Sequence, residues 1–433
     1  MRVELNYGKG RLAVEVEDAR VAAVLRKQRS QAISNPCQAL LESLDHPIGL
    51  EPLSTLCAPG KTACVVTSDL TRPVPNQVIL PVLLGYMEAH GVRRDDVTVL
   101  VATGMHRPAG HEELVELLGP ELMSGYRVVN HKPDSEETLE HLGFTAAGTS
   151  IKVNKSYAAA DLKVLTGLIE PHFMAGYSGG RKSICPGISG MESLAYCHGV
   201  DCLAHAAATN CSLKGNPFHE EALEVARAAG CDFILNVVVD EDRNLTGVFA
   251  GEMEAAHQAG CELVDRIFKA RLERPGEIAL TSSAGYPLDI DFYQTVKGLY
   301  GALPAVKKGG TIIIASRCPE GIGSEQFLEL LKELAAGSPK AFLRDHRKKF
   351  TRDQWEVQKL LQVLARARFM VFSEGLTREE VELAGGEKVG SLEAALETAF
   401  ARHGPNSQAV IIPEGPYVVP EIKRQPAGGG GKS

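Results

Sequence analysis

Short apolar strands that alternate with amphipathic helices constrain the fold of this 433-residue chain more than any other feature. The strand-like runs are rich in β-branched residues, and each stops at a polar or Gly-rich segment, which is typical of strands buried in a parallel sheet. We expect strands at residues 63–67, 97–103, 162–166, 233–239, 278–281, 311–315, 369–373 and 410–412. Helical periodicity predicts helices at 77–89, 218–229, 254–272, 325–335 and 392–400. The alternation predicts an α/β fold with mainly parallel sheets, whose ligands bind beyond the carboxyl ends of the strands.

The segment LERPG at 272–276 marks the predicted domain boundary, because it breaks a long helical pattern just before a new strand. The chain length is typical of two to three domains of about 150 residues. We therefore expect an N-terminal α/β domain over residues 1–270 and a C-terminal α/β domain over 271–424. Residues 425–433 end in GGGGKS and imitate a phosphate-binding loop, but Pro426 stands where that loop needs glycine and no helix follows, so we expect a flexible tail.

The charge balance excludes a general attraction to nucleic acid or to anionic lipid, because 46 Lys and Arg oppose 54 Asp and Glu, for a net charge of -8. No apolar run approaches the roughly 20 residues that span a bilayer. The first residues also lack the apolar stretch of a signal peptide. The ten cysteines include no Cys-x-x-Cys pair and are expected to be reduced thiols. These features predict a cytosolic protein with a small-molecule partner.

Two loops that follow predicted strands carry polar residues of catalytic type. The loop SDLTRPVP at 68–75 holds Asp69 and Thr71 beside Arg72, whose planar guanidinium can bind a carboxylate or phosphate. The loop TGMHRP at 103–108 holds His106, which can act as an acid or a base near neutral pH. Each feature has a structural alternative: an internal ion pair for the Asp and Arg, and an incidental loop position for the histidine.

The richest loop is EPHFMAGYSGGRKS at 170–183, which is followed by Cys-Pro-Gly. Three glycines within five positions permit close approach of the backbone to a ligand. Lys182, just after them, can bind phosphate or act as a nucleophilic amine, and His172 lies ten residues upstream. The alternative is a Gly-rich loop that turns a tight corner and carries solvated cations.

The residues alone do not decide the role of two further clusters. Cys197 and His198, with Cys202 and His205 nearby, could hold zinc, although none of the common zinc spacings is present. A single histidine ligand to a metal that is held mainly by another group is the other interpretation. The segment DFYQTVKG at 291–298 would place Tyr293, Gln294 and Lys297 on one helical face, which could bind an acid or simply face solvent.

Taken together, these segments resemble the nickel-dependent lactate racemase family and its relatives that racemise or epimerise 2-hydroxy acids. The likeness rests on DLTRPVP, TGMHRP, EPHFMAGYSGGRKSICPG, AYCHG and DFYQTVKG, in this order and at these separations. It runs from about Asp69 to the segment around Trp355, the only tryptophan, and the GGRKS motif is its most specific part.

The resemblance implies two α/β domains with the active site in the cleft between them, and the N-terminal domain as the catalytic one. It implies a nickel pincer nucleotide, a pyridinium mononucleotide whose sulfur-bearing arms hold nickel, covalently attached to Lys182. His198 would be the protein ligand to nickel, and His106 and His172 would be the paired acid/base residues. Matching positions are cofactor contacts at Asp69, Thr71 and Tyr293, and substrate contacts at Arg72, Gln294, Lys297 and Trp355. The implied partners are a 2-hydroxy acid and separate enzymes that make the cofactor, and a homo-oligomer is left open.

Such a site suits racemisation because removing the C2 hydrogen as a proton, beside an ionised carboxylate, would place one negative charge next to another. Removing it as hydride avoids this, while a histidine takes the hydroxyl proton and a planar 2-keto acid forms. Return of hydride to the other face inverts the centre.

Three other functions are compatible with parts of the sequence. The first is an epimerase of a longer or more polar acid, such as a dicarboxylate or a sugar acid, on the same scaffold. The second is a metal- or nucleotide-binding protein without turnover. A nicotinamide dehydrogenase is disfavoured, because no Gly-x-Gly-x-x-Gly follows a strand and opens a helix.

Overall fold

The computed structural model describes residues 1–423, and the predicted tail at 425–433 lies outside the described residues. The chain divides into two compact units. Arg29–Ile267 form one, which we call the central unit; Met1–Gln28 and the chain from Phe268 onward form the other, which we call the terminal unit. The predicted domain 1–270 differs from this division in its first 28 residues and in its last three.

The central unit is built on a six-stranded sheet in the order β13-β12-β9-β4-β5-β6. The strands are β4 (Ala63–Ser68), β5 (Val97–Ala102), β6 (Arg127–Asn130), β9 (Leu162–Leu168), β12 (Phe233–Val239) and β13 (Leu245–Gly251). All neighbouring pairs are parallel except β12 with β13. The central strands β4, β5, β9 and β12 are almost continuously buried, as the β-branched runs predicted.

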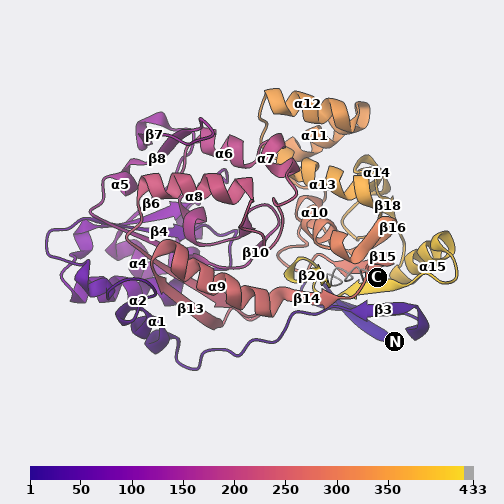
Figure 1. Ribbon diagram of the computed structural model, residues 1–433, viewed down its shortest axis with the longest axis horizontal. Coiled ribbons are helices and arrows are strands. Elements are labelled where there is room, and N and C mark those ends of the chain that lie inside the picture. Colours follow the sequence, from indigo (N-terminus) through magenta and orange to yellow (C-terminus); the bar gives the residue numbers. More distant parts are fainter. Residues whose placement is uncertain (424–433) are drawn as a thin grey trace, which may run out of the picture. The chain divides into compact units, whose positions relative to one another are not determined.

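Helices of the central unit pack their apolar stripes on this sheet. Its longer helices are α1 (Pro36–Asp45), α2 (Asn76–Ala89), α3 (His111–Leu118), α8 (Pro217–Ala229) and α9 (Met253–Phe268). Helices α8 and α9, both labelled in Figure 1, are joined by the ion pair of Arg227 with Glu254. The start of α8 is fixed by Asn216, whose side chain accepts a hydrogen bond from the Phe218 N–H, with Pro217 in the first turn.

The terminal unit contains a second six-stranded sheet, entirely parallel, in the order β18-β17-β16-β15-β19-β3. Its strands are β3 (Val21–Val24), β15 (Gly276–Ser282), β16 (Val306–Ala315), β17 (Arg368–Phe372), β18 (Glu387–Lys388) and β19 (Ala409–Ile412). The N-terminal residues join this unit because β3 adds an edge strand beside β19. Sequence reasoning missed β3, and it also missed the hairpin of β1 (Arg2–Tyr7) and β2 (Gly10–Glu15).

Two apolar layers flank this second sheet, because successive side chains of a strand point to opposite faces. One face packs against α10 (Phe292–Gly301), α11 (Glu325–Ala336) and α13 (Gln354–Arg366). The opposite face packs against the β1–β2 hairpin and α15 (Leu392–His403). The structure therefore confirms the predicted α/β class with mainly parallel sheets.

The helix predicted at 254–272 is wrong in its last four residues. Helix α9 ends at Phe268, and Lys269–Leu272 form strand β14, which pairs in parallel with β20 (Val419–Ile422). The alternation of Lys269 and Arg271 with the buried Ala270 and Leu272 fits a strand as well as a helix end. A partner 150 residues away in the sequence decides between them.

Candidate functional site

The loops after β4 and β5 meet because these strands are parallel neighbours whose carboxyl ends lie at the same edge of the sheet. His106 Nδ1 lies 2.7 Å from Asp69 Oδ2. The other carboxylate oxygen of Asp69 accepts hydrogen bonds from the backbone N–H and the hydroxyl of Thr71, at 3.2 and 2.6 Å. Burial raises the pKa of Asp69, but the hydrogen bonds and the charges of His106 and Arg72 outweigh it and hold that pKa below its usual value.

A charged pair connects the first loop to the loop after β9. Arg72 Nη1 donates to Glu170 Oε1 at 2.9 Å; the Glu170 side chain is largely buried, whereas that of Arg72 is 30% exposed. An ion pair was the structural alternative for this arginine, but its partner is Glu170 rather than Asp69. Sequence reasoning did not single out Glu170. The only feature that could have marked Glu170 as a site residue was its position in the loop after a predicted strand.

The Gly-rich loop after β9 packs tightly on its own chain. A Cβ at Gly176 (φ +80°) would lie 2.2 Å from the Ser212 carbonyl oxygen, and one at Gly179 (φ +75°) would lie 2.7 Å from Asn236 Oδ1. These close approaches are to protein atoms, whereas we expected an approach to a ligand. The glycines let the loop fold back, as the two-residue strands β10 (Pro171–His172) and β11 (Gly176–Tyr177) show.

Arg181 holds this loop from inside. Its side chain is 2% exposed and its guanidinium donates to the carbonyl oxygens of Ala175 at 2.7 Å and Gly179 at 3.4 Å. Burial lowers the pKa of Arg181 to about 10. These hydrogen bonds fix the position of Arg181 in the loop, and Lys182 is the next residue of the chain.

Lys182 and His172 are brought together by this loop. Lys182 Nζ lies 3.0 Å from His172 Nε2 and 5.1 Å from the centre of the Phe218 ring. Burial, followed by the charges of Arg72 and Arg181, lowers the pKa of Lys182 well below its usual value. This lowering favours the neutral amine, which is the nucleophilic form of lysine.

The hydrogen bonds of His172 agree with this protonation state. Its Nδ1 accepts the backbone N–H groups of Met174 and Ala175, at 3.3 and 3.2 Å. A neutral imidazole whose Nδ1 is an acceptor carries its proton on Nε2. The Nε2–H then donates to Lys182 Nζ, and only a neutral amine can accept it.

His198 lies at the end of helix α6 (Met191–Cys197) and contacts the same phenylalanine. The centre of the His198 ring lies 5.3 Å from the centre of the Phe218 ring, edge to face. The centre of the His172 ring lies 6.2 Å from the centre of the same Phe218 ring. The Nδ1 of His198 donates to the Leu194 carbonyl oxygen at 2.9 Å, which fixes the tautomer with the lone pair on Nε2. Burial lowers the pKa of His198 to about 3, so the imidazole is neutral, as a metal ligand must be.

Phe218 is thus the common neighbour of Lys182, His172 and His198, and sequence reasoning missed it. It is fully buried in the first turn of α8, and its only signal was its place in an apolar helical stripe. The structure therefore gathers the predicted residues of the central unit: Asp69, Thr71, Arg72, His106, His172, Lys182 and His198.

The Cys197 to His205 segment does not show a zinc arrangement. Cys197 Sγ lies 3.9 Å from Cys185 Sγ, and both are buried. Among residues 1–423, no group of three or more His, Cys, Asp and Glu side chains is placed to hold a metal ion.

In the terminal unit, the other four predicted residues form a second polar cluster on α10 and α13. Trp355 Nε1 donates to the Tyr293 hydroxyl at 2.8 Å, and Lys297 Nζ donates to Gln294 Oε1 at 2.5 Å. Asp291 caps α10 by accepting the Gln294 N–H at 2.7 Å. The predicted helical face of Gln294 and Lys297 is confirmed, and Glu356 beside Trp355 is an addition that the sequence did not suggest.

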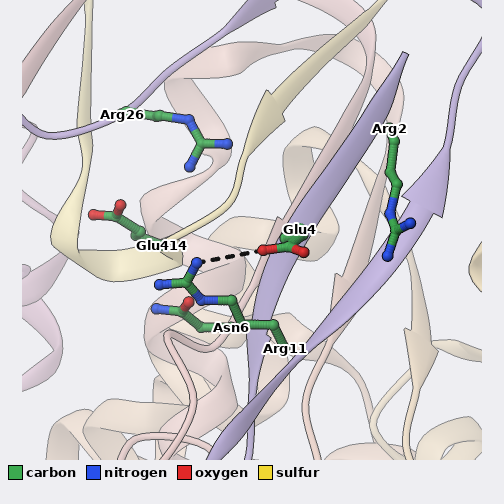
Figure 2. A pocket seen from close by; sticks show the side chains of 6 residues that line it. All are labelled: Arg2, Glu4, Asn6, Arg11, Arg26 and Glu414. Carbon is green, nitrogen blue, oxygen red and sulfur yellow. Dashed lines mark hydrogen bonds and ion pairs between the residues drawn. The ribbon is translucent and has the colours of Figure 1, made fainter.

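A separate surface hollow of the terminal unit, about 330 Å³ in volume, holds none of the predicted residues (Figure 2). Arg2, Glu4, Asn6, Arg11, Arg26 and Glu414 line it. Arg11 pairs with Glu4 at 3.3 Å across the β1–β2 hairpin (Figure 2). Within residues 1–423 no helix has both the length and the apolar character needed to cross a membrane.

Comparisons with known proteins agree with this picture. The family models for the lactate racemase N-terminal and C-terminal domains match residues 7–210 and 272–419. The chain is 34% identical over 423 residues to a lactate racemase of Thermoanaerobacterium thermosaccharolyticum, covering 96% of this chain and 98% of that protein. It is 34% identical over 427 residues to a lactate racemase of Lactiplantibacillus plantarum, covering 96% and 99%. The structure of the lactate racemase apoprotein from T. thermosaccharolyticum superposes with a TM-score of 0.92 at 35% identity, over 97% of this chain and all of that one. The chain belongs to the lactate racemase family.

Proposed function

We propose that this protein is an isomerase that racemises lactate or a closely similar 2-hydroxy acid at C2, with a nickel pincer nucleotide attached to Lys182. The observation that carries the proposal is the grouping of Lys182, His172 and His198 around Phe218. The names and the overall similarity of the two lactate racemases support the substrate class.

The residues of the central unit fit the chemistry of such a cofactor. Lys182 would form the covalent bond, because its burial favours the neutral, nucleophilic amine. His198 would ligate nickel through Nε2, and the remaining donors would be the sulfur-bearing arms of the nucleotide. When bound, this group supplies an acceptor for the C2 hydrogen as hydride. Separate maturation enzymes would deliver it to the chain.

His106 is the side chain best prepared to take the hydroxyl proton of the substrate. Asp69 holds Nδ1–H as a donor, so Nε2 carries the lone pair of the neutral ring. The carboxylate of Asp69 also stabilises the imidazolium that forms when the proton arrives.

His172 would serve the opposite enantiomer. To protonate the oxygen at C2 when lactate re-forms, His172 would have to be the imidazolium, because a neutral ring that gave up its Nε2 proton would be left as an anion. To act as a base, His172 must first carry its proton on Nδ1. The two backbone contacts that oppose this, at 3.3 and 3.2 Å, are long and therefore cheap to release.

We propose Arg72 as the residue that orients the substrate carboxylate from the central unit. Glu170 fixes one side of its guanidinium, which leaves the planar group oriented for a second, charge-assisted contact. Gln294, Lys297 and Trp355 of the terminal unit are proposed substrate contacts, and Asp69, Thr71 and Tyr293 are proposed to support the cofactor.

A chiral assay of the cofactor-loaded protein tests the function. Pure L-lactate and pure D-lactate should each convert to an equal mixture, and a panel of dicarboxylic, aromatic and sugar 2-hydroxy acids should react more slowly. If the protein interconverted the enantiomers of a dicarboxylic or sugar acid but left lactate unchanged, that acid would take the place of lactate as the proposed substrate. No interconversion of any acid by the loaded protein would contradict the function.

A further inference from the structure

Helix α13 buries an unusual set of polar side chains in its first turns. A helix on a sheet normally buries an apolar stripe and exposes the rest. Here Gln354, Glu356 and Lys359 are fully buried and Gln358 is 3% exposed. A buried polar group without a hydrogen bond is costly, and the fold keeps such groups mainly where they serve a function.

Glu356 is the extreme case. Within residues 1–423, neither of its carboxylate oxygens has a hydrogen-bond partner. A carboxylate in that position would lose its hydration without compensation, so the neutral acid is favoured. Burial raises the pKa of Glu356 to about 8, even though Lys297 and Lys359 act to lower it.

The charged and titratable groups that face Glu356 come from two helices and their caps. Lys297 on α10 is the strongest positive influence, and Lys359 on α13 is a weaker one. Asp291, which caps α10, and Asp353, which precedes α13, are the negative groups. Tyr293 on α10 also lies within electrostatic range.

We propose that Glu356 is a positioning residue that sets how much of the positive charge of Lys297 is available to the substrate carboxylate. As a neutral acid, Glu356 leaves the ammonium group to the substrate. As a carboxylate, it competes with the substrate for the same ammonium group. The inference rests on the proposed function, since it requires Lys297 to bind the acid group of the 2-hydroxy acid.

The two states of Glu356 predict a particular pH dependence. From pH 6 to about 7, one unit below the pKa, the residue is mainly neutral, and the KM for lactate should stay constant. Above this range Glu356 ionises, and KM should rise several-fold while kcat changes less, because substrate binding and not the hydrogen transfer is weakened. Glu356→Gln keeps the shape and the neutral state, so its KM should not show this rise.

The experiment compares kcat and KM for lactate from pH 6 to 9.5 in the cofactor-loaded wild type, in Glu356→Gln, and in a control, Glu397→Gln, at an exposed position on α15. A KM rise in wild type and control that is absent in Glu356→Gln supports the inference. The same rise in all three proteins, or no rise in wild type, would overturn it. Absence of racemisation in wild type at every pH would instead overturn the proposed function, and with it this inference.

An infrared titration gives a second measurement that needs neither cofactor nor activity. In the cofactor-free protein, a carbonyl band of a protonated carboxylic acid should persist to about pH 8 and should be missing in Glu356→Gln. Loss of that band near pH 4 to 5 in wild type would show an ordinary, ionised glutamate and would overturn the inference even if the variant were unstable.

Discussion

His106 and His172 belong to neighbouring loops of the same unit, but their surroundings prepare them for opposite tasks. The His106 side chain is 56% exposed, and an aspartate binds its Nδ1. His172 is 7% exposed, and two backbone N–H groups bind its Nδ1. Because a neutral imidazole has one proton, the first ring offers a lone pair at Nε2 and the second offers a donor. The hydrogen-bond partner, and not the residue type, thus decides which of the two neutral rings presents a lone pair at Nε2.

The largest expected effect concerns the partner of His172. Lys182→Ala should lack the covalent mass increment of the cofactor and should reduce racemisation to background, because the amine that we propose to form the bond is removed. Mass spectrometry of the purified protein and a chiral assay measure both. Lys214→Ala, at an exposed position of the same unit, should retain both properties. An intact adduct in Lys182→Ala would refute the attachment site.

Substituting the two histidines should lower activity similarly but affect Lys182 differently. His106→Gln and His172→Gln should each lower kcat by about 10²-fold or more, as expected for the loss of a general base or acid. In the cofactor-free protein, only His172→Gln should alter the rate at which an amine-reactive reagent labels Lys182. Peptide mass spectrometry across a pH series measures this labelling.

Equal labelling of Lys182 in both histidine variants and in wild type would show that His172 does not influence the amine. Near-normal racemisation in both directions by either variant would remove the two-base scheme. The two measurements therefore test the two parts of the comparison separately.

A smaller effect is expected when the partner of His106 is changed. Asp69→Asn should lower kcat by about 10- to 100-fold, because groups that orient a working histidine typically contribute this much. The amide can donate to Nδ1 and so favour the tautomer that lacks the Nε2 lone pair. Asp134→Asn, at an exposed position, is the control. If Asp69→Asn had full activity, the carboxylate would not set the tautomer of His106.

The smallest effect concerns stability rather than catalysis. Burial lowers the pKa values of His131 to about 4 and of His198, His219 and His257 to about 3. Above pH 6.5 these rings are neutral whether the protein is folded or unfolded, so they add no pH dependence. As the pH falls from 6.5 towards 4, only the unfolded chain binds the protons, and folding becomes less favourable.

Urea denaturation at pH 7.5 and at pH 5 should therefore give a lower midpoint at pH 5, and His131→Gln should reduce the difference. An unchanged midpoint would show that these histidines are protonated in the folded protein.

The sequence predicted most of the strands and the meeting of the polar loops that follow them, since both depend on local patterns. Runs such as 233–239 are apolar throughout, and loops at the carboxyl ends of parallel strands must meet at one edge. What it could not predict depends on distant partners. Glu170 becomes a candidate site residue only because Arg72 pairs with it in the folded chain. Phe218 becomes one only because Lys182, His172 and His198 lie around its ring. Strand β14 likewise continued a helical pattern and became a strand only through its pairing with β20.

The fate of the hydrogen at C2 tests the central claim most directly. One enantiomer of lactate that carries deuterium at C2 is incubated in ordinary water with the cofactor-loaded protein. The opposite enantiomer is then isolated, and its deuterium content is measured by mass spectrometry. Hydride transfer, with His106 and His172 exchanging only the hydroxyl proton, predicts that the product keeps its deuterium. Replacement of the deuterium by solvent hydrogen would show that C2 loses a proton instead, and would contradict the account.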